Sequence, residues 1–236
     1  MAAFGPAEYV EQESFVRASE VRALAARAGV GPGVSVLDLC CGTGGPGRLV
    51  MRELGCEYLG VDSSESAVEI AAEHAEGLEG RFAVMEIPPL PPERFEVVLL
   101  LETLLAFRDK EALLQEVGRA LGAGGRFAFT LEEGAPLFEL ERKRMPAADT
   151  VRLLPLDELH ALLERAGLAV RWQEDWSESH GEVAAALLDA YTADSSAIAA
   201  RIGRPALDEL VTAHRLWADW LAAGRVRKFA LVAERV

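Results

Sequence analysis

The 236-residue chain has few cysteines and no long apolar run, and each shortage excludes a class of protein. Two of its three cysteines are the adjacent pair Cys40 and Cys41, so we expect neither a disulfide framework nor a CxxC metal site. No apolar run approaches the roughly 18 residues that a membrane-spanning helix needs. The first residues are acidic where a signal peptide has a basic start, so we expect a cytoplasmic protein without a membrane partner.

Basic residues are also scarce. The 24 Lys and Arg residues face 38 Asp and Glu residues, which gives a net charge of −14. A surface this acidic repels a phosphate backbone, so we expect no nucleic-acid partner. Half of the residues are apolar, which is enough to bury the core of one globular domain. The sequence leaves the oligomeric state open.

Short apolar runs alternate with helical patterns along most of the chain. This alternation predicts an α/β protein with a Rossmann-like, mostly parallel sheet and helices on both faces. We expect seven strands, at residues 34–40, 57–62, 81–86, 95–102, 126–133, 168–175 and 227–235. The run at 95–102 is the most hydrophobic and should lie at the centre of the sheet. We expect helices at residues 9–29, from Pro46, and at about 64–74, 110–121 and 156–166.

Two segments interrupt the alternation. Residues 135–149 contain Pro136, Pro146 and a charge run without a clear period, so we expect a mobile loop. Residues 176–226 lie between the last two strands and carry two stretches of helical period. We expect this insertion, at about 182–200 and 206–222, to form a helical lid.

A glycine-rich turn follows the first predicted strand. Gly42, Gly44 and Gly47 fit the pattern GxGxxG, and Asp62 lies 20 residues after Gly42, which formally suits a dinucleotide. NAD would bring its pyrophosphate close to Asp38, near the end of the first strand, and the like charges would repel. S-adenosylmethionine has no phosphate and carries an ammonium and a sulfonium, so Asp38 favours it over NAD.

Acidic residues also follow the next three strands, with Asp62 after the second, Glu86 after the third and Glu102 after the fourth. The carboxyl ends of parallel strands face one crevice, so these carboxylates should gather there. Such a crevice suits a cation that carries a ribose diol. We therefore expect S-adenosylmethionine as the cofactor.

The segment VLDLCCGTGG at 36–45 resembles motif I of the class I S-adenosylmethionine-dependent methyltransferases. Later pieces resemble further motifs in the family's order, at 60–62, 85–96 and 119–129. The likeness covers about residues 30–132. Glu86 and Glu96 replace the usual Asp, and Ala123 stands where Pro is usual, but none of these changes removes a needed chemical group.

The resemblance implies a single methyltransferase domain over residues 1–236. Its parts would be an N-terminal helical lead-in at 1–30, a cofactor-binding core at 31–133 and a lid or acceptor-binding insertion at 176–226. The implied cofactor-binding residues are Asp38, Cys40, Gly42, Gly44, Asp62, Ser63, Met85, Glu86 and Glu102. We expect no metal.

The resemblance also implies roles for some of these residues. Asp38 would hold the methionine moiety together with the glycine backbone, and Asp62 would bind the ribose hydroxyls. Met85 and Glu86 would border the adenine, although Met85 also suits an ordinary core position. For Cys40, a small packing role beside the turn is the alternative to cofactor contact.

The acceptor site leaves more alternatives open. Candidate catalytic residues are His180, Glu102 and Tyr191. His180 follows the sixth strand and is either a general base or a solvent-exposed loop histidine. Trp217 and Trp220 lie three residues apart on one helix face, where they either anchor the helix on the core or contact the acceptor.

The layout of the insertion is similar to that of small-molecule methyltransferases that act on sarcosine, phosphoethanolamine or isoprenoid diphosphates. The resemblance therefore implies methyl transfer to a small-molecule acceptor, at an N, O or C atom that the sequence leaves undetermined. Two alternatives stay open. The chain could be a non-catalytic S-adenosylmethionine-binding regulator, or an NAD(P)-dependent reductase, although no Tyr is followed four residues later by a Lys.

Overall fold

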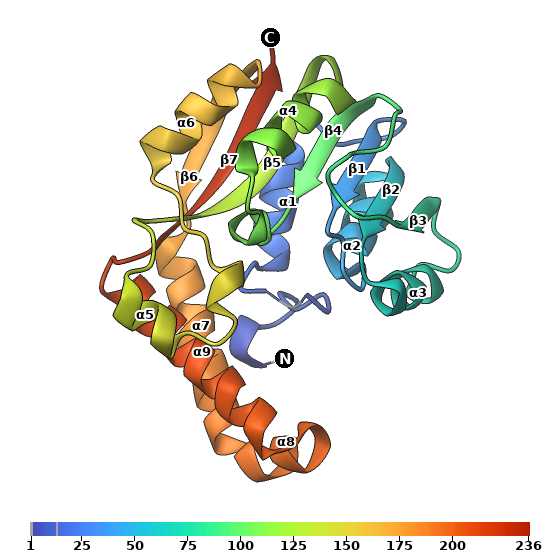
Figure 1. The fold of residues 1–236 in the computed structure, drawn as a ribbon. Helices are drawn as coiled ribbons and strands as arrows, with labels where there is room; N and C mark the ends of the chain where they lie inside the picture. The colour runs from blue at the N-terminus through green and yellow to red at the C-terminus, as the bar shows by residue number, and fades with distance from the viewer. Residues whose placement is uncertain (1, 13) are drawn as a thin grey trace.

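The computed structural model describes residues 2–12 and 14–236, in which seven strands form one sheet. The strand order is β3-β2-β1-β4-β5-β7-β6 (Figure 1). The strands are β1 (Ser35–Leu39), β2 (Glu57–Asp62), β3 (Gly80–Val84), β4 (Phe95–Leu100), β5 (Leu121–Glu133), β6 (Leu168–Asp175) and β7 (Arg227–Arg235). Strands β1 to β5 pair in parallel, and β7 runs antiparallel to both β5 and β6. The carboxyl ends of the parallel strands therefore meet at one edge of the sheet.

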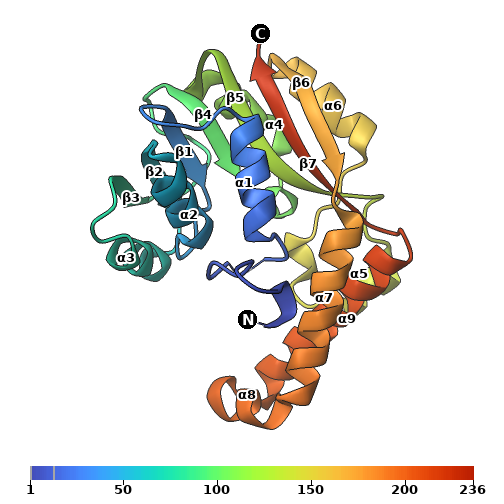
Figure 2. The same ribbon diagram turned by 180° about the vertical axis from the view of Figure 1, so that it is seen from behind.

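Helices cover both faces of this sheet. They are α1 (Ala18–Arg27), α2 (Gly45–Leu54), α3 (Glu65–His74), α4 (Lys110–Ala120), α5 (Glu139–Arg144), α6 (Leu156–Arg165), α7 (Ser177–Ala193), α8 (Ser195–Ile202) and α9 (Arg204–Ala222). Helices α4 and α6 pack on one face, and α1 and α2 pack on the other (Figure 2). None of the described helices combines the length and the hydropathy of a membrane span.

Strand β4 is the fourth of the seven in the sheet, which confirms its predicted central place. Val98 and Leu100 lie in the core formed with α4 and α6. Val97 and Leu99 lie in the core formed with α1 and α2. Successive side chains of a strand point to opposite faces, so a strand buried on both faces is apolar throughout. The predicted α/β fold with seven strands is confirmed.

The N-terminal helix is shorter than the sequence predicts. It begins at Ala18 rather than at residue 9, and the residues before it form an irregular strap, which we define as residues 8–12 and 14–17. The buried Gln12 side chain accepts a hydrogen bond from the Val10 backbone and donates to the carbonyls of Glu8 and Val16. Because one side chain binds these main-chain groups, the apolar spacing at 9–16 does not produce a helix.

Residues 135–149 do not form the predicted loop, because they contain α5. The Arg225 guanidinium lies 2.7 Å from the Glu141 carboxylate and also donates to the carbonyls of Ala135 and Pro136. Met145 is buried in an apolar cluster with α9. These tertiary contacts fix a segment whose local sequence shows no period.

The predicted helical insertion between β6 and β7 is confirmed as α7, α8 and α9. Helices α7 and α9 pack side by side, and α8 joins them at the end far from the sheet (Figure 1). The insertion begins at the end of β6 and ends just before β7. The first turns of α7 and the last turns of α9 therefore lie next to the sheet (Figure 2).

Candidate functional site

The turn between β1 and α2 explains why glycine is needed at each position of the GxGxxG pattern. Gly42 and Gly44 have φ values of +54° and +75°, which residues with a β-carbon rarely adopt. A β-carbon on Gly44 would also lie 3.0 Å from the β-carbon of Ala71. A β-carbon on Gly47 would overlap the Tyr58 hydroxyl. The pattern thus brings α2 close to β2 and leaves the backbone of the turn facing the strand ends.

Asp62 joins the end of β2 to this turn. Its Oδ2 accepts a hydrogen bond of 2.9 Å from the Gly42 backbone, and its Oδ1 accepts one of 2.9 Å from the Ser64 backbone. Each carboxylate oxygen can accept more than one hydrogen bond. The carboxylate can therefore hold the turn and still accept the two hydroxyls of a ribose.

Asp38 is buried beneath the turn and accepts a hydrogen bond of 2.5 Å from the Tyr58 hydroxyl. Burial raises the pKa of Asp38 to about 7, with the Tyr58 hydrogen bond opposing the shift and the nearby Asp62 charge adding to it. The charge of this carboxyl therefore depends on whether a cation lies beside it.

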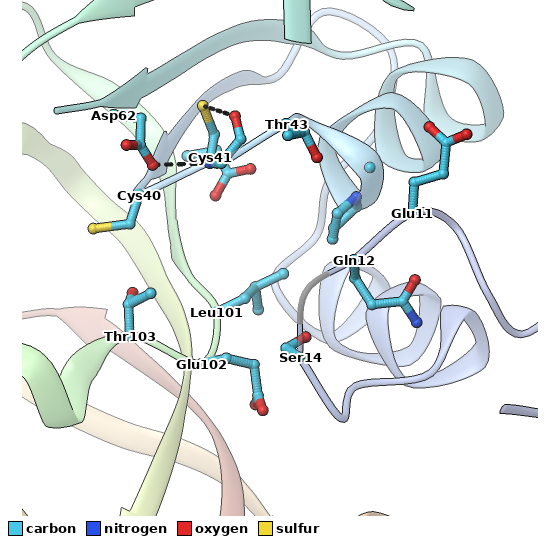
Figure 3. Close-up of a pocket in the computed structure, with 14 residues that line it drawn as sticks. Glu11, Gln12, Ser14, Cys40, Cys41, Thr43, Asp62, Leu101, Glu102 and Thr103 are labelled. Atoms are coloured by element: carbon cyan, nitrogen blue, oxygen red, sulfur yellow. Dashed lines mark hydrogen bonds between the residues drawn. The ribbon is translucent and has the colours of Figure 1, made fainter. Parts of the chain in front are cut away.

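A cavity of about 270 Å³ opens at the carboxyl ends of the strands, between the turn and the strap (Figure 3). Figure 3 shows Ser14 of the strap beside Leu101 and Glu102, with Asp62 on the far side of the cavity. A β-carbon on Gly45 would overlap the carbonyl oxygen of Val10, so the strap lies directly on the start of α2. The lining residues are Glu11, Gln12, Ser14, Asp38, Cys40, Cys41, Gly42, Thr43, Gly45, Pro46, Asp62, Leu101, Glu102 and Thr103.

The structure brings together at this cavity five of the predicted cofactor-binding residues, namely Asp38, Cys40, Gly42, Asp62 and Glu102. Gly44 shapes the turn without lining the cavity. The remaining three, Ser63, Met85 and Glu86, lie outside the lining.

Of those three, Ser63 and Glu86 are exposed, while Met85 packs against the main core. The backbone of Met85 donates a hydrogen bond to the carbonyl of Asp62, which keeps it next to the end of β2. The strap residues Glu11, Gln12 and Ser14 were missed, because their sequence predicts a helix. No local signal marks them.

A second cavity of about 230 Å³ lies between the strand ends and the helical insertion. Its lining residues are Ser14, Phe15, Glu102, Leu105, Glu132, His180, Ala213, His214, Trp217, Leu221, Val226 and Lys228. Ser14 and Glu102 line both cavities. The two spaces are therefore neighbours, with the Glu102 side chain at their common wall.

A buried ion cluster closes one end of the second cavity. The Nζ of Lys228, a residue that is 2% exposed, lies 2.5 Å from the Glu102 carboxylate and also pairs with Glu132. Burial opposes the charge of Lys228, but the two carboxylates outweigh it and raise its pKa. Burial likewise opposes the charge of Glu102, yet Lys228 and His180 lower its pKa. Burial raises the pKa of Glu132, to which the Glu102 charge adds.

His180 is fully buried, so the alternative of a solvent-exposed loop histidine is wrong. It lies in the first turns of α7, where its ring stacks on Trp176 at a centroid distance of 6.0 Å. Its Nε2 lies 3.2 Å from the Glu20 carboxylate, and its Nδ1 lies 3.8 Å from the Glu102 carboxylate. Nε2 thus has Glu20 as its partner, whereas Nδ1 is buried without a hydrogen-bond partner within the described part of the chain. A buried polar group of this kind is available to a ligand.

Glu20 was missed as a site residue, because an acid in the first turn of a helix is ordinary. The Glu20 carboxylate accepts hydrogen bonds from the Arg17 backbone at 2.7 Å and from the Ser179 hydroxyl at 2.6 Å. Burial opposes its charge, but His180 and these donors lower its pKa. An ionised Glu20 thus fixes the position of the His180 ring from α1.

The aromatic residues of the insertion divide between cavity and core. Trp217 lines the second cavity, whereas Trp220 is buried in the apolar cluster beneath α9 and fits the packing interpretation. Tyr191 lies outside the lining, in a small cluster with Phe4, and its ring meets that of His214 edge-on at 4.8 Å. The structure thus groups His180 and Glu102 and leaves Tyr191 apart from them.

Residues 36–125 match the profile of a family described as a methyltransferase domain. This segment of the chain is therefore a methyltransferase domain, and the match supports the predicted class I S-adenosylmethionine-dependent methyltransferase. It is similar to methyltransferase GfsG of Streptomyces halstedii, with 30% identity over 179 residues that cover 70% of this chain and 63% of the relative. The chain thus spans less than two thirds of the length of that relative.

Two solved structures show how far the methyltransferase fold extends. Phosphoethanolamine N-methyltransferase 2 of Haemonchus contortus, in complex with S-adenosylhomocysteine, aligns with a TM-score of 0.83 at 20% identity. The alignment covers 99% of this chain and 55% of that one. The [4+2]-cyclase SpnF aligns with a TM-score of 0.78 at 23% identity, covering 98% and 89%. The fold therefore includes the strap and the helical insertion.

Proposed function

We propose that this protein transfers the methyl group of S-adenosylmethionine to a small-molecule acceptor held in the second cavity. The observation that carries the proposal is that Glu102 and Ser14 line both cavities. One cavity has the glycine turn and acids that suit the cofactor, and the other is bounded by the insertion. A donor and an acceptor bound in adjoining cavities meet the main requirement of methyl transfer, which is close alignment.

The residues of the first cavity fit the cofactor. The Asp62 carboxylate can accept the ribose hydroxyls while it holds Gly42. Asp38 lies beneath the turn, where its ionised form favours a cation. When bound, S-adenosylmethionine supplies a methyl group already activated by its sulfonium. The strap residues Gln12 and Ser14 cover the cavity and exclude water from it.

His180 is the residue that we assign as proton acceptor. A hydroxyl acceptor loses its proton on methylation, and an amine held as an ammonium must lose a proton before its nitrogen can attack. His180 lines the second cavity, and its Nδ1 is unpaired among the described residues. Glu20 lies 3.2 Å from Nε2 and stabilises the imidazolium that forms, which leaves Nδ1 to take the proton. Glu102 lies 3.8 Å from that nitrogen and adds to the stabilisation.

A direct test separates this function from the alternatives. The protein is titrated by calorimetry with S-adenosylhomocysteine and with NAD, and is then screened for methyl transfer to amines, phenols, carboxylates and prenyl diphosphates. We expect binding of S-adenosylhomocysteine but not of NAD, and transfer to at least one acceptor. The expected loss of transfer in His180→Gln, with cofactor binding retained, assigns the chemistry to this site.

The opposite outcomes are equally specific. Binding of NAD in place of S-adenosylhomocysteine would support the reductase alternative. Binding of S-adenosylhomocysteine without transfer to any acceptor class would support a cofactor-binding regulator. Because the fold also serves the [4+2]-cyclase SpnF, the screen monitors the acceptor by mass as well as the cofactor product.

A further inference from the structure

We infer that the second cavity selects acceptors with a largely apolar body that present hydrogen-bond donors, hydroxyl or amine, and that it excludes phosphates and carboxylates. This inference rests on the proposed function and specifies its acceptor class. It follows from three properties of the cavity as the described residues form it: its apolar walls, its single Lys or Arg residue, and its unpaired polar atoms.

The walls of the cavity are mainly apolar. Phe15 comes from the strap and Leu105 from the segment after β4. The other apolar residues come from α9 and the segment that follows it, and they are Ala213, Trp217, Leu221 and Val226. A highly polar acceptor would place charge against these apolar side chains, and it would gain no free energy from burying their surface. An aliphatic or aromatic body gains free energy by covering them.

Lys228 is the one Lys or Arg that lines the cavity among the described residues, and it is not available to an anion. Its ammonium lies 2.5 Å from the Glu102 carboxylate and also pairs with Glu132. A phosphate would have to displace a carboxylate from Lys228 and leave that carboxylate buried without a partner, at a large cost. The ionised Glu102 would also repel the phosphate directly.

The unpaired polar atoms require donors from a ligand. Within the described residues, Oε2 of Glu132 and Nδ1 of His180 are buried without a hydrogen-bond partner. With the His180 proton placed on Nε2, which faces Glu20, Nδ1 is an acceptor. A hydroxyl or an amine satisfies such atoms, whereas a carboxylate or a phosphate dianion has only acceptors to offer.

The test uses four probes that share one apolar body. Equilibrium dialysis measures the binding of 2-naphthol, 2-naphthylamine, 2-naphthoate and 2-naphthyl phosphate to the protein saturated with S-adenosylhomocysteine. We expect the naphthol and the naphthylamine to bind at least about tenfold more tightly than either anion. Equal or tighter binding of an anion would overturn the inference, and so would a cavity that takes none of the four.

A variant reverses the selection if the inference is correct. Glu102→Gln removes an ionised partner of Lys228, so the affinity for 2-naphthyl phosphate should rise by about tenfold or more. Glu132→Gln provides a second variant with the same expected direction. Glu133→Gln is the matched control, because Glu133 is the next residue of β5, points to the other face and pairs with Arg227. Unchanged phosphate affinity in both Glu102→Gln and Glu132→Gln would overturn the role given to Lys228.

Failure of this inference differs from failure of the proposed function. The dialysis reads binding without turnover. Methyl transfer to a carboxylate or a phosphate ester would support the proposed function and overturn the inference. Bound naphthol probes with no methyl transfer to any compound of the screen would support the inference about binding and overturn the function.

Discussion

The Nδ1 of His180 lies 3.8 Å from the carboxylate of Glu102, although His180 belongs to the helical insertion and Glu102 follows the central strand of the sheet. Glu102 lines both cavities, and His180 lines the second. This contact therefore marks the place where the cofactor and an acceptor would meet.

Replacing His180 by Gln should lower kcat for a hydroxyl acceptor by about a hundredfold or more, since a positioned base contributes that much. The dissociation constant of S-adenosylhomocysteine should change little, because His180 does not line the cofactor cavity. Steady-state kinetics and calorimetry check both values. Glu182→Gln is the control, because Glu182 lies two residues further along α7 but its side chain is 62% exposed. Unchanged kcat in His180→Gln would remove the base from the mechanism.

Replacing Asp62 by Ala should weaken binding of S-adenosylhomocysteine tenfold to a hundredfold, corresponding to about 1.5–3 kcal/mol for a charged hydrogen bond. Asp62 also holds Gly42, so the melting temperature of each variant is measured first. Asp62→Asn provides the comparison, because its amide retains one acceptor oxygen and the shape of the side chain. Parent-like affinity in a folded Asp62→Ala protein would disprove the ribose assignment.

Binding of S-adenosylmethionine should strengthen as the pH rises through 7. Burial raises the pKa of Asp38 to about 7, and a bound cation favours its ionised form, so binding releases a proton. Affinity at pH 6 should be about tenfold weaker than at pH 8. Calorimetry in buffers of different ionisation enthalpy measures how many protons are released on binding.

The control for this prediction is Asp38→Asn, in which the pH dependence should flatten. Of the groups that face Asp38, Tyr58, Cys41 and Cys56 all have raised pKa values and stay neutral in this range. An equally steep profile in Asp38→Asn would assign the proton to another group.

The stability of the folded protein should depend on pH in the opposite direction to cofactor binding. The folded state favours protonated Asp38, so the free energy of unfolding falls as the pH rises from the ordinary pKa of 3.8 towards 7.

Replacing Gly45 by Ala should accelerate dissociation of S-adenosylhomocysteine by about tenfold, as expected if about 1.4 kcal/mol of strap contact is lost. The added β-carbon would overlap the Val10 carbonyl and move the strap from the cofactor cavity. Stopped-flow fluorescence measures the rate. Gly31→Ala is the matched control, because a β-carbon there meets no atom within 4 Å. Equal dissociation rates in the two variants would contradict the covering role of the strap.

The helical insertion should act as a lid. Amide exchange in residues 176–190 and 135–149 should slow when S-adenosylhomocysteine and an acceptor are added together, because α9 lines the second cavity and packs on both segments. The central strand β4 should stay protected throughout. No change in either segment at saturating ligand would refute the lid and would favour a large acceptor.

Local sequence patterns specify the strand-end side of the proposed cofactor site, although not the strap that lies across it. The apolar strands, the glycine turn and the acids at the strand ends are all local patterns, and the topology of a parallel sheet brings strand ends together without further information. Asp38, Gly42 and Asp62 are therefore identifiable from their positions in the chain. The central place of β4 follows from its unbroken apolar run, since a strand buried on both faces is apolar throughout.

The proposed acceptor site depends instead on tertiary packing. Its polar residues come from four separate elements: Glu20 from α1, Glu102 from the end of β4, His180 from α7 and Lys228 from β7. No spacing in the sequence links residues so far apart. The strap is irregular because the Gln12 side chain binds main-chain groups on both sides of it, an interaction that hydrophobic periodicity does not register. Helix α5 forms where Arg225, more than eighty residues away in the chain, holds Glu141. The physical reason is the same in each case: buried ion pairs and side-chain hydrogen bonds depend on which groups the fold brings within a few ångströms, and that proximity is a property of packing.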